Sequence, residues 1–432
     1  METALIGIIV LFVLLFAGAP IAVAVGSSAI LIWVLDPTIM TSPGYVLQAI
    51  VNSLDSYVLL SVPLFILSGI IMAKGGIAKK LFDFFTFFIG GKTAGLPCAV
   101  VVTCLFYGAL SGSGPATCAA VGSMTIPVLV NLGYQKSFAT ALVSVAGALG
   151  VIIPPSIPLV IYGQVTSTSV GQLFIAGIIP GILIGVFLML YAYIYCKRKG
   201  EDREKIDAVY FEIRSKGFIT VFKDSFWALL TPVIILGGIY GGIVTPTEAA
   251  CVSVVYSLII SVVVYRTLPL KMVPQAFIDA VHTFAPMIWI IGACSAFGRA
   301  MALLGASQAL TDWLTSTFAT KVAVMLMINL ILIIMGCLMD TIASILLMAP
   351  LLLPVAALMG VNPVHFGIIM IVNLSIGFTT PPVGGNLFVA QALTKLPVTQ
   401  ITKQAAPFML FFFVALMIIT FVPSVSMVLL GR

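Results

Sequence analysis

Long runs of apolar residues alternate along this chain with short breaks made of Gly, Pro and small polar residues. Most runs approach the length of about 20 residues that an α-helix needs to cross a bilayer, and they predict about ten to twelve crossings. Thr93–Asn131 and Leu338–Ala357 are cut by Gly and Pro, so their share of that count is ambiguous. The pattern predicts an all-α polytopic membrane protein. The uncut runs include Leu5–Leu35, Ser56–Met72, Gln172–Cys196, Phe226–Tyr240, Cys251–Tyr265, Val322–Leu338 and Phe408–Val422.

Composition and charge support this interpretation. Of the 432 residues, 61% are hydrophobic and only 8% are charged, a balance that soluble domains do not show. The net charge is +6, and eight of the 20 Lys and Arg residues lie between Lys197 and Lys223. Because positive charge collects on the cytoplasmic side, residues 197–225 are predicted to form a cytoplasmic linker between membrane segments 1–196 and 226–432.

Several common features have no counterpart in the sequence. The start, Met1–Ala24, lacks the basic segment of a signal peptide and stays apolar beyond its usual length, so we expect a retained first helix. No Walker A loop is present, which argues against ATP hydrolysis by the chain itself. With only His282 and His365 and no CxxC pair, no metal or haem site is indicated, and neither a cofactor nor an enzymatic activity is expected. The seven cysteines lie in or beside apolar runs, at Cys98, Cys104, Cys118, Cys196, Cys251, Cys294 and Cys337.

The positions of Gly and Pro recur in the two halves of the chain. Six positions repeat at one offset of 227 residues, whereas chance predicts about one such match. They pair Pro127, Gly133, Gly150, Pro154, Pro155 and Pro180 with Pro354, Gly360, Gly377, Pro381, Pro382 and Pro407. A second offset of 223 pairs Pro63, Gly69 and Gly75 with Pro286, Gly292 and Gly298. We therefore predict two repeats and favour an inverted arrangement, although the uncertain parity of crossings leaves a parallel one open.

Each predicted repeat contains two broken helical segments, near 107–122 and 147–163 in the first half and near 336–355 and 374–391 in the second. Broken helices are tolerated at membrane depth only where protein buries them or where they line a cavity. Paired breaks at matching positions indicate the binding site of a secondary transporter, in which free carbonyls bind a cation such as Na+ and helix N-termini face an anion. Doubled prolines in ordinary surface loops are the alternative, which the repeated G-x-x-x-P-P pattern disfavours.

Four charged residues lie in or beside apolar runs, where an ionised group costs at least about 2.5 kcal/mol at mid-bilayer. Asp340 has apolar neighbours and is too short to reach the interface, so a functional role is favoured. Arg299 either binds substrate or snorkels from a helix end. Glu248 follows an expected N-cap at Thr245, and helix capping explains it as well as function does. Asp55 is best explained as the start of a helix at the interface.

Ser111–Pro115 reads Ser-Gly-Ser-Gly-Pro, which predicts a chain break followed by a helix with Pro in its first turn. Such small residues leave backbone N–H groups open for an anion or polar ligand, but they also permit tight helix packing. The offset of 227 residues places Ser113 on Asp340. Each half therefore carries a polar break at the same point, which favours the functional alternative.

Several ordered motifs resemble the large membrane subunit of TRAP (tripartite ATP-independent periplasmic) transporters, and the likeness spans nearly the whole chain. The resemblance implies an elevator-type secondary transporter of the bacterial inner membrane. It also implies Na+-driven uptake of organic acids, including dicarboxylates and sialic acids. The implied partners are a small membrane subunit on a separate chain and a soluble periplasmic binding protein. The motifs are GALSGSGPAT, GALGVIIPPSIPLVIYG, LFIAGIIPG, TPTEAA and MDTIASILLMAPLLLP.

The same resemblance, carried over motif by motif, implies site residues. Sodium would be held by backbone and hydroxyl oxygens at Ser111, Gly150, Ile153, Pro155, Gly336, Gly377, Thr380 and Pro382. The substrate would lie near Ser111, Ser113, Ser156, Arg299 and Asp340. The first doubled proline is followed by Ser156 and the second by Val383. We interpret this asymmetry as the first half supplying more of the substrate contacts.

Two other functions fit fewer of these features. A stand-alone Na+-coupled anion symporter of similar design would work without a binding protein, so a flux assay lacking that protein separates it from a TRAP system. A channel or a structural membrane subunit belongs to a different class. A channel would need a continuous polar pore and a ring of like charges, whereas this sequence has isolated charges and two broken segments.

Overall fold

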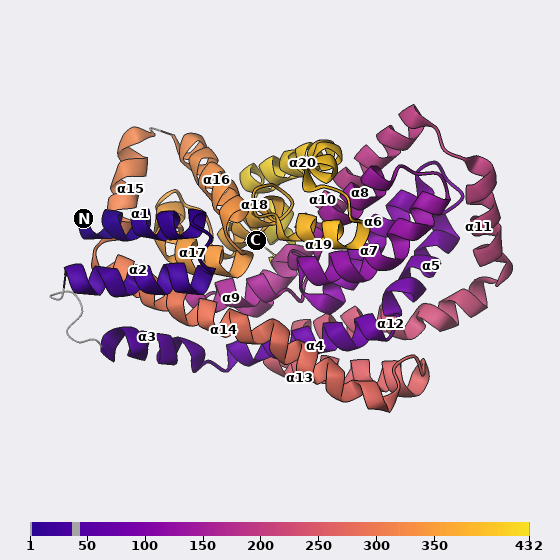
Figure 1. The fold of residues 1–432 in the computed structure, drawn as a ribbon, viewed down its shortest axis with the longest axis horizontal. Helices are drawn as coiled ribbons and strands as arrows, with labels where there is room; N and C mark the ends of the chain where they lie inside the picture. Colours follow the sequence, from indigo (N-terminus) through magenta and orange to yellow (C-terminus); the bar gives the residue numbers. More distant parts are fainter. Residues whose placement is uncertain (1, 37–43, 319, 432) are drawn as a thin grey trace.

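A computed structural model describes residues 2–36, 44–318 and 320–431 of the chain. Within these ranges the protein is helical and contains no β-strand, as the apolar runs predict. The outermost residues of the two predicted membrane segments, Met1 and Arg432, lie outside the described residues. In Figure 1 the helices α1, α2 and α3 lie at one end of the molecule and α5 and α11 at the other.

The helices of the first half precede a helical linker, and a second series follows it. The first series is α1 (Glu2–Phe16), α2 (Ile21–Leu35), α3 (Gly44–Leu54), α4 (Ser61–Lys74), α5 (Ile77–Ile89), α6 (Gly95–Ser111), α7 (Gly114–Asn131), α8 (Lys136–Gly147), α9 (Ile157–Thr166) and α10 (Val170–Lys199). The linker helix is α11 (Arg203–Ser215). The second series is α12 (Phe218–Tyr240), α13 (Pro246–Leu258), α14 (Val273–Leu303), α15 (Ala306–Thr317), α16 (Lys321–Leu338), α17 (Thr341–Leu358), α18 (Pro363–Gly377), α19 (Gly385–Thr394), α20 (Val398–Phe421) and α21 (Ser424–Met427).

The start of the chain differs from the single first helix that we expected over Met1–Ala24. Helix α1 ends at Phe16, and the apolar run continues as a second helix, α2, packed beside the first. Gly18 adopts a positive φ of 85°, which favours glycine. Pro20 has no N–H to extend the first helix and stands directly before the second, where a proline is tolerated. The two residues together turn the chain back.

Seven helices in the described part of the chain are long and apolar enough to cross a membrane, or eight if α3 and α4, bent by 64°, count as one broken span. This is fewer than the ten to twelve crossings that we expected. Several apolar runs are divided by their breaks into helices of 10–17 residues, which include α6, α8, α9 and α18. An apolar run in this sequence therefore does not always form one unbroken helix of spanning length.

The helix ends recur at the spacing of the sequence pattern. Helices α6 and α16 end at Ser111 and Leu338, and α7 and α17 begin at Gly114 and Thr341. Both pairs of positions differ by 227 residues. The short helices that follow pack on the opposite half: α9 contacts α17 and α18, whereas α19 contacts α7 and α8. The two halves are therefore interlocked around α8 and α18, whose side chains are almost entirely buried.

A buried carboxylate anchors the linker to the first half. The Glu201 side chain, only 2% exposed, forms a salt bridge with Arg203 at 3.0 Å. It also accepts hydrogen bonds from the Ala94 N–H at 3.0 Å and from the Tyr134 hydroxyl at 2.6 Å. Burial and the hydrogen bond to Glu201 raise the pKa of Tyr134, so the phenol stays protonated and donates. Arg203 adds a 2.6 Å bond to the Thr93 hydroxyl.

Replacing Glu201 by Ala leaves the Ala94 N–H and the Tyr134 hydroxyl buried without an acceptor. We expect the variant to be about 2 kcal/mol less stable, measured as a lower thermal midpoint of the purified protein. Glu204→Ala is the matched control, because Glu204 is exposed on α11. An equal midpoint for both variants would show that the linker is not held at this point.

Candidate functional site

The break in the first half is a hairpin tip between α6 and α7. Gly112 has a left-handed φ of 59° and ends α6, a conformation that glycine adopts without strain. Ser113 is extended and begins α7, which has Pro in its first turn. The Ser111 hydroxyl lies 2.8 Å from the Thr117 hydroxyl, and the Ser113 carbonyl accepts from Thr117 at 2.8 Å. Hydroxyl and carbonyl oxygens thus converge at this tip.

The tip rests on the doubled-proline segment that joins α8 to α9. The Ile157 N–H donates to the Gly112 carbonyl at 3.2 Å. A methyl group built on Gly112 would lie 2.9 Å from the Pro155 carbonyl oxygen, and one built on Gly150 would lie 2.8 Å from the Ser113 carbonyl oxygen. The segment begins with a 3₁₀ turn over Ala148–Val151. The predicted sodium residues Ser111, Gly150 and Pro155 therefore lie around one point.

Ile153, the remaining predicted sodium residue of the first half, turns its side chain away from the tip. Its Cδ1 and Cγ1 atoms are the nearest ones to a methyl group built on Gly181 of α10. Its N–H donates to the Leu149 carbonyl at 2.9 Å. Only a backbone oxygen of Ile153 remains for an ion.

The second half repeats this arrangement with different side chains. Its tip lies between α16 and α17, and the Val383 N–H donates to the Cys337 carbonyl at 3.1 Å. A methyl group built on Gly377 would lie 2.5 Å from the Gly336 Cα. Thr380 donates to the Ile376 carbonyl at 2.8 Å. The predicted residues Gly336, Gly377 and Thr380 are thus brought together, and Pro382 lies in the same segment. The peptides Pro154–Pro155 and Pro381–Pro382 are both cis.

Asp340 and Ser113 stand at the same point of the two tips but differ in their contacts. Both precede the first residue of a helix. The half-buried Asp340 carboxylate accepts from the Ile342 N–H at 3.0 Å, whereas Ser113 makes no side-chain cap. Among the described residues, no Lys, Arg or His lies within salt-bridge distance of Asp340. Its carboxylate therefore caps the positive end of α17 without a cationic side-chain partner.

Ser156 has a fully satisfied hydroxyl. It is completely buried, donates to the Val151 carbonyl at 2.5 Å and accepts from the Leu159 N–H at 3.4 Å. It thereby caps α9 and closes the doubled-proline segment. The equivalent Val383 cannot make such a cap. Ser156 and Val383 therefore differ in how they close the two segments, and the expected substrate role of Ser156 stays a prediction.

Two cavities lie beside these elements. The first, of about 610 Å³, lies between α4, α6, α7 and α14 and is lined by Ser111, Ser113 and Tyr107. Lys74 borders it and forms a 2.6 Å salt bridge with Asp279. The second, of about 350 Å³, lies between α3, α9, α14 and α17. Neither cavity is lined by Ser156 or Asp340.

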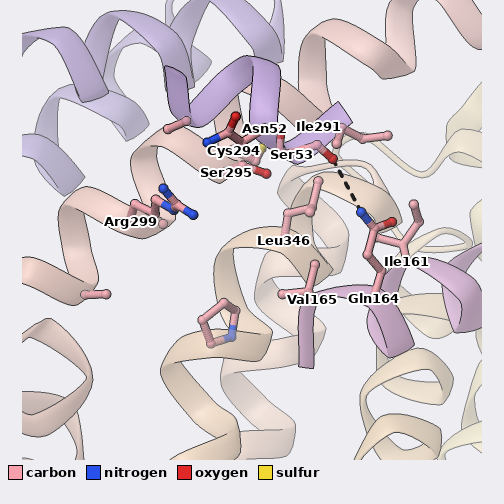
Figure 2. Close-up of a pocket in the computed structure, with 14 residues that line it drawn as sticks. Asn52, Ser53, Ile161, Gln164, Val165, Ile291, Cys294, Ser295, Arg299 and Leu346 are labelled. Carbon is pink, nitrogen blue, oxygen red and sulfur yellow. Dashed lines mark hydrogen bonds between the residues drawn. The ribbon is translucent and has the colours of Figure 1, made fainter. Parts of the chain in front are cut away.

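Arg299 lines the second cavity, and Figure 2 shows its guanidinium pointing into that space from α14. The side chain is exposed, and no salt bridge to it is found among the described residues. Asn52, Ser53 and Gln164 join it, and Gln164 donates to the Ser53 carbonyl at 3.4 Å. The Gln164 Oε1 is buried without a partner. A fixed cation with amide and hydroxyl groups around it suits an anion.

The structure thus divides three of the five predicted substrate residues between two cavities, and Ser156 and Asp340 line neither of them. Ser111 and Ser113 line the first cavity and Arg299 the second, and Arg299 forms no ion pair with Asp340. Sequence reasoning missed Gln164, because an uncharged polar residue in an apolar helix carries no distinctive local signal. Next to Arg299, a methyl group built on Gly298 of α14 would lie 3.7 Å from the Leu346 carbonyl oxygen of α17.

The remaining charged candidates have structural positions. Glu248 forms the expected capping box with Thr245: its carboxylate accepts from the Thr245 N–H at 2.7 Å. Asp55 is exposed at the bend between α3 and α4. Asn52 and Ser53 lie in the last turn of α3 and do not precede a helix start. Asp55 therefore follows the end of one helix, whereas we expected it to begin one, and α4 begins only at Ser61.

Comparison with known proteins finds relatives that align with nearly the whole of this chain. Residues 8–425 match the family described as the DctM component of tripartite ATP-independent periplasmic transporters. The chain is 41% identical over 417 residues to the isethionate TRAP transporter permease protein DctMQ of Oleidesulfovibrio alaskensis, covering 96% of this chain and 65% of that protein. It is 40% identical over 375 residues to the C4-dicarboxylate TRAP transporter large permease protein DctM of Pseudomonas aeruginosa, covering 87% and 86%.

A third relative widens the range of named substrates. The chain is 34% identical over 423 residues to the sialic acid TRAP transporter large permease protein SiaM of Vibrio cholerae, and the match covers 96% of both chains. The chain therefore spans slightly less than two thirds of the isethionate relative but most of the other two.

Solved structures resemble the chain in fold. The YdaH transporter of Alcanivorax borkumensis superposes with a TM-score of 0.65 at 13% identity, covering 100% of this chain and 99% of that one. MtrF of Neisseria gonorrhoeae gives a TM-score of 0.60 at 15% identity, covering 87% and 83%. At these identities the likeness concerns the fold alone, which is that of membrane transporters.

The contact between Gly336 and Gly377 generates a prediction. A methyl group in Gly377→Ala meets the backbone of Gly336, which cannot give way, so the second tip cannot rest on its broken segment. We expect the initial rate of substrate uptake to fall about tenfold or more, as misplacements near 1 Å do in active sites. Gly237→Ala is the control, because nothing lies within 4 Å of the added methyl. Normal uptake by Gly377→Ala at matched expression would contradict the prediction.

Proposed function

The chain belongs to the DctM family of tripartite ATP-independent periplasmic transporters, and we propose that it carries an organic acid anion into the cell together with Na+. As a member of this family it is a secondary transport subunit, a large permease protein that crosses the bacterial inner membrane several times. The proposal concerns the coupling ion, the substrate, the partners and the way in which the chain moves.

The observation that carries the proposal is the docking of each hairpin tip on the broken segment of its own half. Carbonyl and hydroxyl oxygens converge there from both sides, around Ser111 and Gly150 in the first half and Gly336 and Thr380 in the second. Unwound backbone of this kind coordinates Na+ in secondary transporters. Nearby Asp340 adds a negative charge without a cationic side-chain partner. These features support two sodium sites, one in each half.

The second cavity supports an anionic substrate. Arg299 keeps its charge when poorly solvated and can bind a carboxylate through two parallel hydrogen bonds. The relatives are named for isethionate, C4-dicarboxylates and sialic acid, all of them organic acids. We therefore propose a small organic acid as substrate, of the sialic acid or C4-dicarboxylate class.

The interlocked halves support an elevator-type movement of inverted repeats. Because α9 and α19 each pack on the opposite half, the two tips and both broken segments form a single unit that can move together. We propose that a small membrane subunit braces the rest of the chain and that a soluble periplasmic protein delivers the substrate. Uptake by the chain alone would instead favour a stand-alone symporter.

The function is tested by uptake into liposomes that contain the chain with its partners. We expect uptake to need an inward Na+ gradient and no ATP, and equal uptake with K+ alone on both sides would refute sodium coupling. Asp340→Asn removes a charge but keeps a residue that caps helices as well as Asp does. We expect this variant to lose most Na+-dependent uptake at normal expression.

Asp312→Asn is the matched control for that variant. Asp312 lies on α15, is exposed and accepts a hydrogen bond from Gln308 at 3.0 Å. Its replacement should change neither the sodium concentration that gives half-maximal uptake (the sodium midpoint) nor the maximal rate of uptake. If Asp340→Asn also leaves both unchanged, Asp340 is a helix cap without a part in coupling.

Arg299 is tested separately, because it lies in the other cavity. Lys keeps the charge but cannot form the paired bonds of a guanidinium. We expect Arg299→Lys to raise the substrate KM about tenfold, the loss of about 1.4 kcal/mol of binding, without changing the sodium midpoint. Arg214→Lys on the linker helix should have no effect. Near-normal uptake by Arg299→Ala would show that Arg299 does not bind the substrate and only extends its charged group to the membrane interface.

A further inference from the structure

Asn386 is a fully buried polar residue in the first turn of α19, and it joins the two halves of the chain. Only Gly385 separates it from the broken segment 378–384. Its N–H donates to the Phe378 carbonyl at 3.1 Å, which closes that segment on itself. Its side-chain Nδ2 donates to the Ser144 carbonyl of α8 at 3.0 Å, across 242 residues of sequence. One residue thus connects the break of the second half with the helix that leads into the break of the first.

The Ser144 carbonyl needs an outside donor because α8 tightens at this point. The N–H of Ala148 points to Val145, three residues back, instead of to Ser144. A 3₁₀ turn begins at Ala148 and leads into the doubled prolines. A buried carbonyl without a donor is costly in a membrane. Asn386 supplies the missing donor, so its bond stabilises the end of α8 in its broken form.

The same side chain touches the hairpin tip of the first half. A methyl group built on Gly114, the first residue of α7, would lie 3.2 Å from Asn386 Oδ1 and 3.4 Å from its Nδ2. The Cys118 thiol, one turn further on, donates to the Asn386 carbonyl at 3.7 Å. Ser113 places no side-chain acceptor on this helix start. The Asn386 amide therefore lies against the positive end of α7.

The first half has no polar residue at the equivalent place. The offset of 227 residues places Leu159 of α9 opposite Asn386, and Leu159 is buried and apolar. Helix α9 is bonded to the second half through Tyr162, whose hydroxyl donates to the Pro363 carbonyl at the start of α18. The bond between Tyr162 and Pro363 lies at the start of α18, whereas the second broken segment follows the end of α18. The tie made by Asn386 therefore runs from the second break to the first.

We infer that Asn386 is a positioning residue that makes the broken segments of the two halves open and close together. The inference rests on the proposed function, in which the hairpin tips and broken segments of both halves hold sodium. Movement of segment 378–384 displaces Asn386, and with it the Ser144 carbonyl and the start of α7. Ion occupancy in the second half is thereby transmitted to the tip that carries Ser111.

The tie is tested first without sodium, by hydrogen–deuterium exchange of the full chain in lipid nanodiscs. Asn386→Leu nearly preserves the volume and installs the residue type of the first half. We expect exchange of segment 144–157 to accelerate about three- to tenfold, the worth of one buried hydrogen bond. Unchanged exchange there would overturn the inference. Asn386→Ala, which adds no bulk, serves as a second variant if the first does not fold.

Asn329→Leu is the matched control. Asn329 is also a buried amide, but its bonds to Met325, Asn373 and Thr420 all stay in the second half. Its replacement should leave exchange of segment 144–157 unchanged. Equal acceleration in the Asn329 and Asn386 variants would show a general loss of stability and would also overturn the inference.

A sodium titration of the same samples tests the coupling. In the unmodified chain we expect Na+ to protect segments 376–386 and 111–117 with a common midpoint. In Asn386→Leu the midpoint for 111–117 should rise about three- to tenfold above that for 376–386. Midpoints that remain equal would overturn the inference. If sodium protects neither segment in the unmodified chain, the proposed sodium coupling fails, and the sodium-free comparison alone decides whether the tie exists.

Discussion

Hydrocarbon offers no hydrogen-bond partner to a peptide group, and this constraint governs the molecule. A helix that breaks inside the membrane frees several N–H and C=O groups, each of which must find protein, ligand or ion. The helices break at four places, which form two matching pairs, and other residues of the chain supply hydrogen bonds at these breaks. Ile157 bonds to the first tip, Val383 to the second, and Asn386 to the loosened end of α8. Oxygens that remain without protein donors mark where a ligand can enter.

Interlocking of the halves follows from the same constraint. Helices α9 and α19 each pack on the opposite half, and the side chains of α8 and α18 are almost entirely buried. Close approach of backbone to backbone is possible there only through glycine, as at Gly336 and Gly377. Each hairpin tip is therefore seated on the broken segment of its own half by close backbone contacts, and glycine matters there as much as charged side chains do.

Sequence patterns predicted those features that depend on local chemistry. The helical class, the position of the breaks and the capping box of Thr245 and Glu248 follow from residues a few positions apart. The division of the predicted substrate residues between two cavities did not, because the placement of Arg299 and Ser111 depends on how α14 packs against α4 and α17. Gln164 was missed for a related reason: its significance comes only from the cavity into which α9 carries it.

The exchange of short helices also constrains how the protein is made. When the ribosome has completed the first half, α7 and α8 still lack the helix that covers them, and the Ser144 carbonyl lacks its donor. That donor is synthesised 242 residues later. Until then the first half lacks the packing and the hydrogen bond that α19 supplies. The first half of the transport unit therefore reaches its final packing only after α19 has been synthesised, and a chain that stops before α19 leaves α7 and α8 without that cover.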